Sequence, residues 1–138
     1  MIHASTPAPL PNNVKLAAAL FVVYGLAVVF NATAMQGSAN WVAAADFPRA
    51  LIRLLGTMVI AWGLLHRARW AWWLGVGLAA VWLAAGALAV LVFERGDVYW
   101  LPPSGLQIFL VVSLLCLGLS LALLLSPSAR AVFRRPVT

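Results

Sequence analysis

Apolar positions along this chain come in long blocks that short polar stretches separate. Each block is about as long as the roughly 20 residues that a helix needs to cross the hydrocarbon core of a bilayer. The pattern predicts an all-α membrane protein in which four transmembrane helices form a compact up-down bundle with short loops. The expected spans cover about 14–35, 48–65, 70–93 and 105–125.

The stretches outside the spans are too short to hold a soluble domain. Residues 1–13 are rich in proline and have no apolar period, so we expect a flexible tail, and we expect a basic tail over 127–138. The four-helix domain between them is expected over 14–126. Its first span resembles a signal peptide ending in "NATA", but the long Pro-rich start with a single lysine favours an uncleaved helix.

Proline and capping residues predict where two of the helices begin or end. Asp46 is expected to cap the second helix, with Pro48 near its first position, where a missing N–H costs nothing. Ser126 and Pro127 are expected to end the fourth helix.

Composition supports the membrane assignment and excludes one class of partner. The chain is 64% hydrophobic and 9% charged, whereas soluble domains are about 45–50% apolar and about 25% charged. The basic residues that give the net charge of +6 are therefore expected at the membrane edges, and no nucleic-acid partner is expected. Cys116 is the only cysteine, which leaves no intramolecular disulfide and predicts a small packing residue.

The basic residues predict the orientation by the positive-inside rule. With four spans, both termini and the 66–69 hairpin share one side, which carries more lysine and arginine than the other. We therefore expect both termini in the cytoplasm of a bacterial-type cell that holds the chain in its inner membrane. The cytoplasmic side carries Lys15, Arg67, Arg69, Arg130, Arg134 and Arg135, and the other side carries Arg49, Arg53 and Arg95.

Small residues predict the faces on which the helices pack, because lipid is as apolar as leucine and helices associate through close approach. The clearest stripe lies on the third span, and shorter ones lie on the first and second. The residues expected at helix–helix contacts are Gly25, Gly56, Gly63, Gly77, Ala80, Ala84 and Ala87.

Arg53 is the most informative polar residue, because a charge about one turn inside a span is costly. One interpretation is a structural arginine that snorkels outward to an acid. The other is an anion or headgroup site, or a contact with a partner. The expected polar site near the outer face comprises Arg53, Arg49, Asn31, Asp46, Glu94 and Asp97. Asn31 is also expected to form a hydrogen bond between helices, together with Tyr24 on the same face.

Basic and aromatic residues next to the spans predict anchors at the membrane interface, where an indole has one wet edge and one apolar face. At least one tryptophan of the 70–73 cluster should face lipid, and another can face the second helix or a partner. The 94–104 loop is either part of this aromatic belt or an external recognition surface. The expected anchors are Arg67, Arg69, Trp70, Trp72, Trp73, Trp41, Tyr99 and Trp100.

Catalytic motifs such as HExxH, GxSxG, CxxC or a phosphate-binding loop do not occur in the sequence, so neither an enzyme nor a cofactor or metal site is expected. No acid, lysine or histidine lies at mid-membrane, which argues against a proton-coupled transporter. The favoured hypothesis is an accessory subunit of a larger membrane complex, with lipid and other subunits as partners. The alternatives are a homo-oligomeric channel or carrier, and an immunity or stress protein that recognises an external effector through the 94–104 loop.

Overall fold

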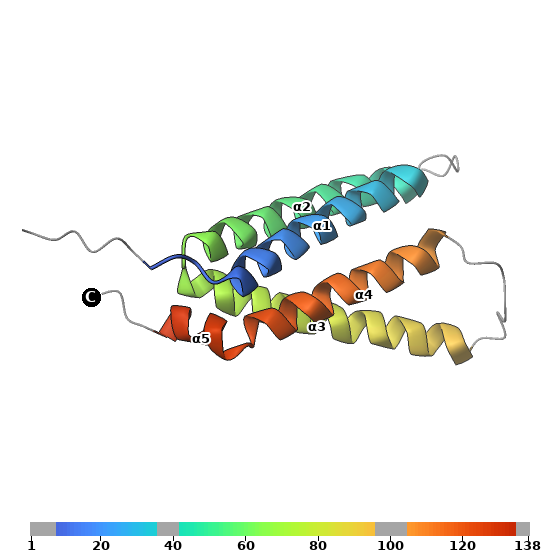
Figure 1. Ribbon diagram of the computed structural model, residues 1–138. Helices are drawn as coiled ribbons and strands as arrows, with labels where there is room; N and C mark the ends of the chain where they lie inside the picture. The colour runs from blue at the N-terminus through green and yellow to red at the C-terminus, as the bar shows by residue number, and fades with distance from the viewer. Residues whose placement is uncertain (1–7, 36–41, 96–104, 135–138) are drawn as a thin grey trace, which may run out of the picture.

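The chain folds into five helices and contains no strand in the part that the computed structural model describes, residues 8–35, 42–95 and 105–134 (Figure 1). Three helices are long and apolar enough to cross a membrane, and α4 with α5 makes a fourth candidate if this pair, bent by 60°, counts as one span. These spans indicate a multi-pass membrane protein. The helices are α1 (Asn12–Met35), α2 (Val42–Leu65), α3 (Arg69–Arg95), α4 (Gly105–Leu124) and α5 (Pro127–Arg134).

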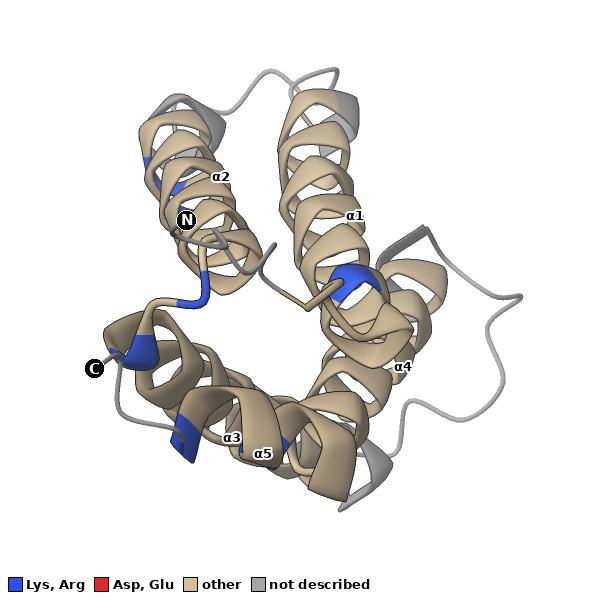
Figure 2. Cartoon of the chain, turned by 60° about the vertical axis from the view of Figure 1, so that its left-hand side comes forward, with Lys and Arg blue, Asp and Glu red and all other residues tan. Residues whose placement is uncertain are grey.

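The four long helices form a ring in which α1 contacts α2 and α4, and α3 contacts the same two helices. The backbones of the diagonal pairs, α1 with α3 and α2 with α4, do not approach each other closely among the described residues. One end of the ring holds the α2–α3 turn, the start of α1 and α5, and we call it the turn end. Figure 2 looks towards this end and shows basic residues at the start of α1, at the turn and on α5.

The core lies mainly along α1, whose buried residues repeat at a helical spacing. Val14, Ala17, Ala18, Phe21 and Tyr24 are all buried, and this spacing places them on one face of the helix. From α4 the residues Ser113, Cys116, Leu117, Ser120 and Leu124 are buried. The expectation that Cys116 is a small packing residue agrees with its place on this face.

Helix α2 begins six residues earlier than the sequence predicts. It starts at Val42 and contains Pro48 within its second turn, so Pro48 is not the first helical residue and Asp46 lies inside the helix. The physical reason is that the run of alanines before Asp46 favours helix strongly. Proline this close to a helix start removes only one hydrogen bond.

The turn between α2 and α3 closes with a Schellman motif that has arginine in the position where glycine is usual. The Ala68 N–H donates to the Gly63 carbonyl at 2.9 Å, and the Arg67 N–H donates to the Leu64 carbonyl at 3.1 Å. This geometry forces a left-handed backbone on Arg67, whose φ is 58°. A non-glycine residue in that conformation costs about 1–2 kcal/mol.

Replacing Arg67 with glycine is expected to relieve this strain. Because both variants lack the guanidinium, the difference between Arg67→Gly and Arg67→Ala isolates the backbone. We expect the glycine variant to have the higher free energy of unfolding, by about 1 kcal/mol. Denaturation in detergent micelles, followed by tryptophan fluorescence, measures the difference. Equal stability of the two variants would show that the turn does not strain residue 67.

Residues 127–134, expected to belong to a basic tail, instead form the helix α5, which packs against the turn end. Ala129 and Phe133 are buried, and the Arg69 side chain donates to the carbonyls of Phe133 and Arg134 at the end of the helix. Asn13 of α1 donates to the hydroxyls of Ser126 and Ser128 at its start, at 3.3 and 3.0 Å. The expected stop of α4 at Ser126 and Pro127 agrees with the break between α4 and α5.

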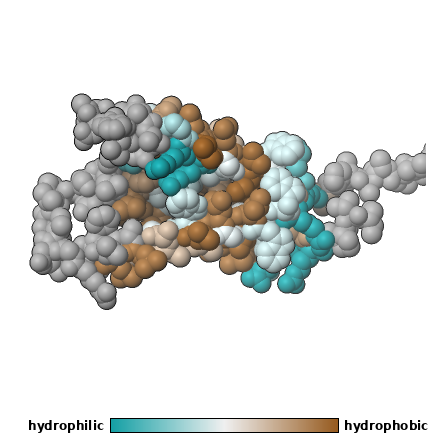
Figure 3. All heavy atoms as spheres, turned by 180° about the vertical axis from the view of Figure 1, so that it is seen from behind, coloured by the Kyte–Doolittle hydropathy of each residue, from teal (hydrophilic) through white to brown (hydrophobic). Residues whose placement is uncertain are grey.

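The outer surface of the ring is apolar, as a helix surrounded by lipid requires. Large apolar side chains are exposed on all four long helices, among them Phe30, Ile52, Val81 and Leu115. On the face that Figure 3 shows, apolar groups form a band that one hydrophilic patch interrupts, and hydrophilic and pale aromatic groups border the band at the turn end. This border is where the water-facing ends of membrane helices carry their charged and aromatic residues.

Candidate functional site

Arg53 lies on α2 against an aromatic ring of the neighbouring helix. Its guanidinium carbon is 4.2 Å from the centre of the Trp82 ring on α3, a cation–π contact. The side chain is exposed, and so is that of Arg49 one turn away. Within the described residues, Arg53 therefore bridges α2 and α3 through Trp82, a partner that the sequence analysis did not identify.

Of the other members of the expected outer polar site, Asn31 is not joined to Arg53 in the described part of the chain. Asn31 is half-buried on α1, and neither it nor Tyr24 forms the expected hydrogen bond between helices there. The side chains of Asp46 and Glu94 lie outside the described residues, as does all of Asp97.

The tryptophan cluster at the start of α3 divides between the outer surface and the interior. Trp73 is 69% exposed and Trp70 is 45% exposed, whereas Trp72 turns inward. The Trp72 Nε1 donates to the Leu124 carbonyl at 3.0 Å, and its ring stacks on Phe133 with a centroid distance of 6.3 Å. Trp72 thus ties α3 to the ends of α4 and α5, and the two exposed indoles are available to lipid.

The two arginines of the turn, expected as anchors that reach lipid phosphates, both donate to backbone carbonyls. Arg67 donates to the carbonyl of Ala8, ahead of α1. Arg69 donates from Nε to Phe133 at 2.7 Å and from Nη2 to Arg134 at 3.0 Å. Carbonyls at a helix end carry partial negative charge, so Arg69 also stabilises the α5 dipole. The anchors expected at the opposite end, Trp41, Tyr99 and Trp100, lie outside the described residues.

Gly25 and Gly63 lie where two helices approach closely. A Cβ atom at Gly25 would meet the hydroxyl of Thr57 and would be 3.4 Å from the Cα of Leu54 on α2. A Cβ at Gly63 would be 2.5 Å from that of Ala71 on α3. Gly25 thus permits the close contact between α1 and α2, and Gly63 permits the close contact between α2 and α3.

The expected stripe on α3 is not the face on which α3 packs within the chain. A Cβ at Gly77 would meet nothing within 4 Å, and the same holds at Gly56 on α2. The remaining stripe residues Ala80, Ala84 and Ala87 are exposed. The inward face of α3 carries a second set of small residues, among them Gly75, Ala79 and Gly86. Since Gly75 and Gly77 are two residues and so about 200° apart, α3 has small residues on opposite sides.

Sequence reasoning missed the buried residues of α5, of which Phe133 stacks on Trp72. Ala129, Val132 and Phe133 recur at helical spacing and are at least partly buried, whereas Arg130 and Arg134 are exposed between them. This alternation is the signal of a short amphipathic helix, and it is visible in the sequence.

Comparison of the chain with protein-family models, with curated proteins and with solved structures gives no match.

Proposed function

We propose that this chain is a non-catalytic subunit or protein-binding partner within a larger membrane complex, and that it packs against another protein through α3. The observation that carries the proposal is the exposed small-residue face of α3. This face comprises Gly77, Ala80, Ala84 and Ala87, and it is separate from the face on which α3 packs within the chain. The occupant we propose is an apolar transmembrane helix of another membrane protein.

Close approach of two backbones is the main source of helix association in lipid, where burial of apolar surface supplies little driving force. The face from residue 77 to residue 87 rises about 15 Å along α3, close to three helical turns. Val81 and Leu88 are exposed beside it and form ridges next to the small residues. A partner helix with leucine-sized side chains fits such a surface, because its side chains fill the space above the glycine and alanines.

The proposed topology has four spans with both termini in the cytoplasm of a bacterial-type inner membrane. Its support is the basic residues Lys15, Arg67, Arg69, Arg130 and Arg134 at the turn end. The positive-inside rule places that end in the cytoplasm. The fourth span is α4, and α5 then lies along the cytoplasmic interface as a short amphipathic helix.

Substitution of Ala84 tests the proposal. Tagged chain is purified in mild detergent from membranes of its native cell, and the amount of each co-purifying membrane protein is measured per chain. We expect a stoichiometric partner with the natural chain. We also expect about tenfold lower recovery with Ala84→Leu, because a leucine on the small face keeps the helices apart at a cost of about 1–3 kcal/mol.

The matched control is Ala122→Leu, the same change at an exposed alanine of α4. It should leave recovery of the partner unchanged, and both variants should melt at the same temperature as the natural chain. Equal recovery with the two variants would contradict the proposed surface. A lone monomer at native abundance would contradict the subunit role itself, and a stable homo-oligomer would favour the channel or carrier alternative.

A further inference from the structure

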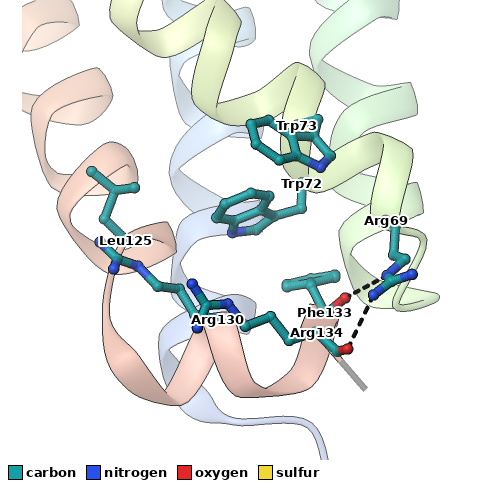
Figure 4. A pocket seen from close by; sticks show the side chains of 7 residues that line it. All are labelled: Arg69, Trp72, Trp73, Leu125, Arg130, Phe133 and Arg134. Carbon is teal, nitrogen blue, oxygen red and sulfur yellow. Dashed lines mark hydrogen bonds between the residues drawn. The ribbon is translucent and has the colours of Figure 1, made fainter. Parts of the chain in front are cut away.

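A cavity of about 490 Å³ lies at the turn end, where the start of α3, the end of α4 and the helix α5 meet. This volume is within the roughly 300–1,000 Å³ that is typical of small-ligand sites. Figure 4 shows Trp72 and Trp73 on one side of it, Arg130 and Arg134 on the other, and Arg69 at its edge. Trp73 of its lining lies one turn before Gly77 on the same side of α3, so the cavity adjoins the outward face of α3. The inference below does not rest on the proposed partner.

The cavity concentrates positive charge that no lining group neutralises. Three arginines line it, and no acidic residue is among its lining residues. Arg69 is held by two backbone carbonyls of α5. Arg130 and Arg134 lie four residues apart on α5, and neither guanidinium forms a hydrogen bond or ion pair with any residue that the structure describes. Like charges around one space repel one another, so an anion between them is favoured.

The opposite wall is apolar and fixed in place. Trp72 is held by its hydrogen bond to Leu124 and by its contacts with Phe133 and with the Trp73 ring, which lies edge-on at 4.9 Å. Leu125 is a further apolar residue of the lining. One side of the cavity therefore suits an anion, and the other suits hydrocarbon.

We infer that this cavity binds the phosphate group of an anionic phospholipid. Arg130 and Arg134 bind the phosphate oxygens, since a guanidinium donates two parallel hydrogen bonds to such a group. The glycerol end of the acyl chains lies against Trp73 and Leu125. The position at the border of the apolar band favours a lipid over a soluble phosphate, because headgroups lie at this level and juxtamembrane arginines attract anionic lipids.

The test compares lipid binding to the purified full chain by native mass spectrometry from detergent micelles. Phosphatidylglycerol, phosphatidylcholine and inorganic phosphate are added separately. We expect phosphatidylglycerol to bind at least about tenfold more tightly than phosphatidylcholine, whose choline cancels the phosphate charge. We expect excess inorganic phosphate to displace little of the bound lipid. Equal affinity for the two lipids, or efficient displacement by inorganic phosphate, would overturn the assignment.

Charge variants distinguish lipid binding in the cavity from general attraction of the lipid by the positive charge of the turn end. Arg130→Gln with Arg134→Gln should weaken phosphatidylglycerol binding at least about tenfold. The control, Lys15→Gln with Arg67→Gln, removes the same charge from the same end outside the cavity. It should change the affinity for phosphatidylglycerol less than threefold, because salt screens the attraction between exposed charges and the lipid. A second pair, Arg130→Lys with Arg134→Lys, keeps the charge and should lower the affinity for phosphatidylglycerol only a few fold. Equal losses in the glutamine pair and in the control would overturn the proposal.

Discussion

Gly25→Leu is expected to lower the free energy of unfolding by about 3 kcal/mol. The side chain would enter the contact between α1 and α2, where Thr57 and the backbone of Leu54 already occupy the space. The hydroxyl of Thr57 donates to the Leu54 carbonyl at 2.8 Å, so this wall has little freedom to move aside. Denaturant titration of the chain in detergent micelles, followed by helical circular dichroism, measures the loss.

The matched control is Gly56→Leu on α2, where an added Cβ would meet nothing within 4 Å. Its stability should stay the same or rise by up to about 1 kcal/mol, because leucine favours helix more than glycine does. If the two leucine variants were equally stable, the α1–α2 contact at Gly25 would not be as close as the structure has it.

The long helices could be predicted from the sequence because the bilayer imposes a strong physical constraint. A backbone inside hydrocarbon must satisfy its own hydrogen bonds, so an apolar run of sufficient length becomes a helix almost regardless of its neighbours. The predicted spans 14–35, 70–93 and 105–125 accordingly agree with α1, α3 and α4 within two residues at each end. The predicted start of α2 is wrong because proline is tolerated close to a helix start, so Pro48 does not mark the boundary.

The packing faces could be predicted only in part, because small residues mark two sides of α3. Residue spacing alone does not show whether the side of Gly77 or the side of Gly75 packs within the chain. The packing side depends on the helices that surround α3. The structure resolves it, since a Cβ at Gly75 would lie 3.3 Å from side-chain atoms of Ile60 and Leu124, whereas one at Gly77 would meet nothing. The outward stripe is thereby left exposed.

The cavity at the turn end could not be predicted, because its walls come from segments distant in the sequence. The contact of Trp72 with Leu124 at the end of α4 and the contacts of Arg69 with α5 span 52 to 65 residues of chain. The helix α5 itself was predictable from its alternating apolar and basic residues. It was missed because an eight-residue helix is too short to be recognised by a criterion based on membrane thickness.

Phe133→Ala is expected to release α5 from the bundle while α1–α4 remain folded. Phe133 is 5% exposed and stacks on Trp72, and truncating a buried phenylalanine costs about 3–5 kcal/mol. Loss of about 3 kcal/mol of docking energy raises the population of the undocked helix about 100-fold. Hydrogen exchange of the amides of 127–134, measured by mass spectrometry, should accelerate accordingly, whereas exchange in α1 should not change.

Phe30→Ala is the matched control, because Phe30 is 74% exposed on α1 and the same atoms are removed. It should leave exchange in α5 at the natural rate. Release of α5 also separates Arg130 and Arg134 from the Trp72 wall, so Phe133→Ala should weaken phosphatidylglycerol binding together with docking. If α5 stayed protected in Phe133→Ala, the hydrogen bonds from Arg69 and Asn13 would be sufficient to hold it. The aromatic contact would then contribute little to the position of the helix.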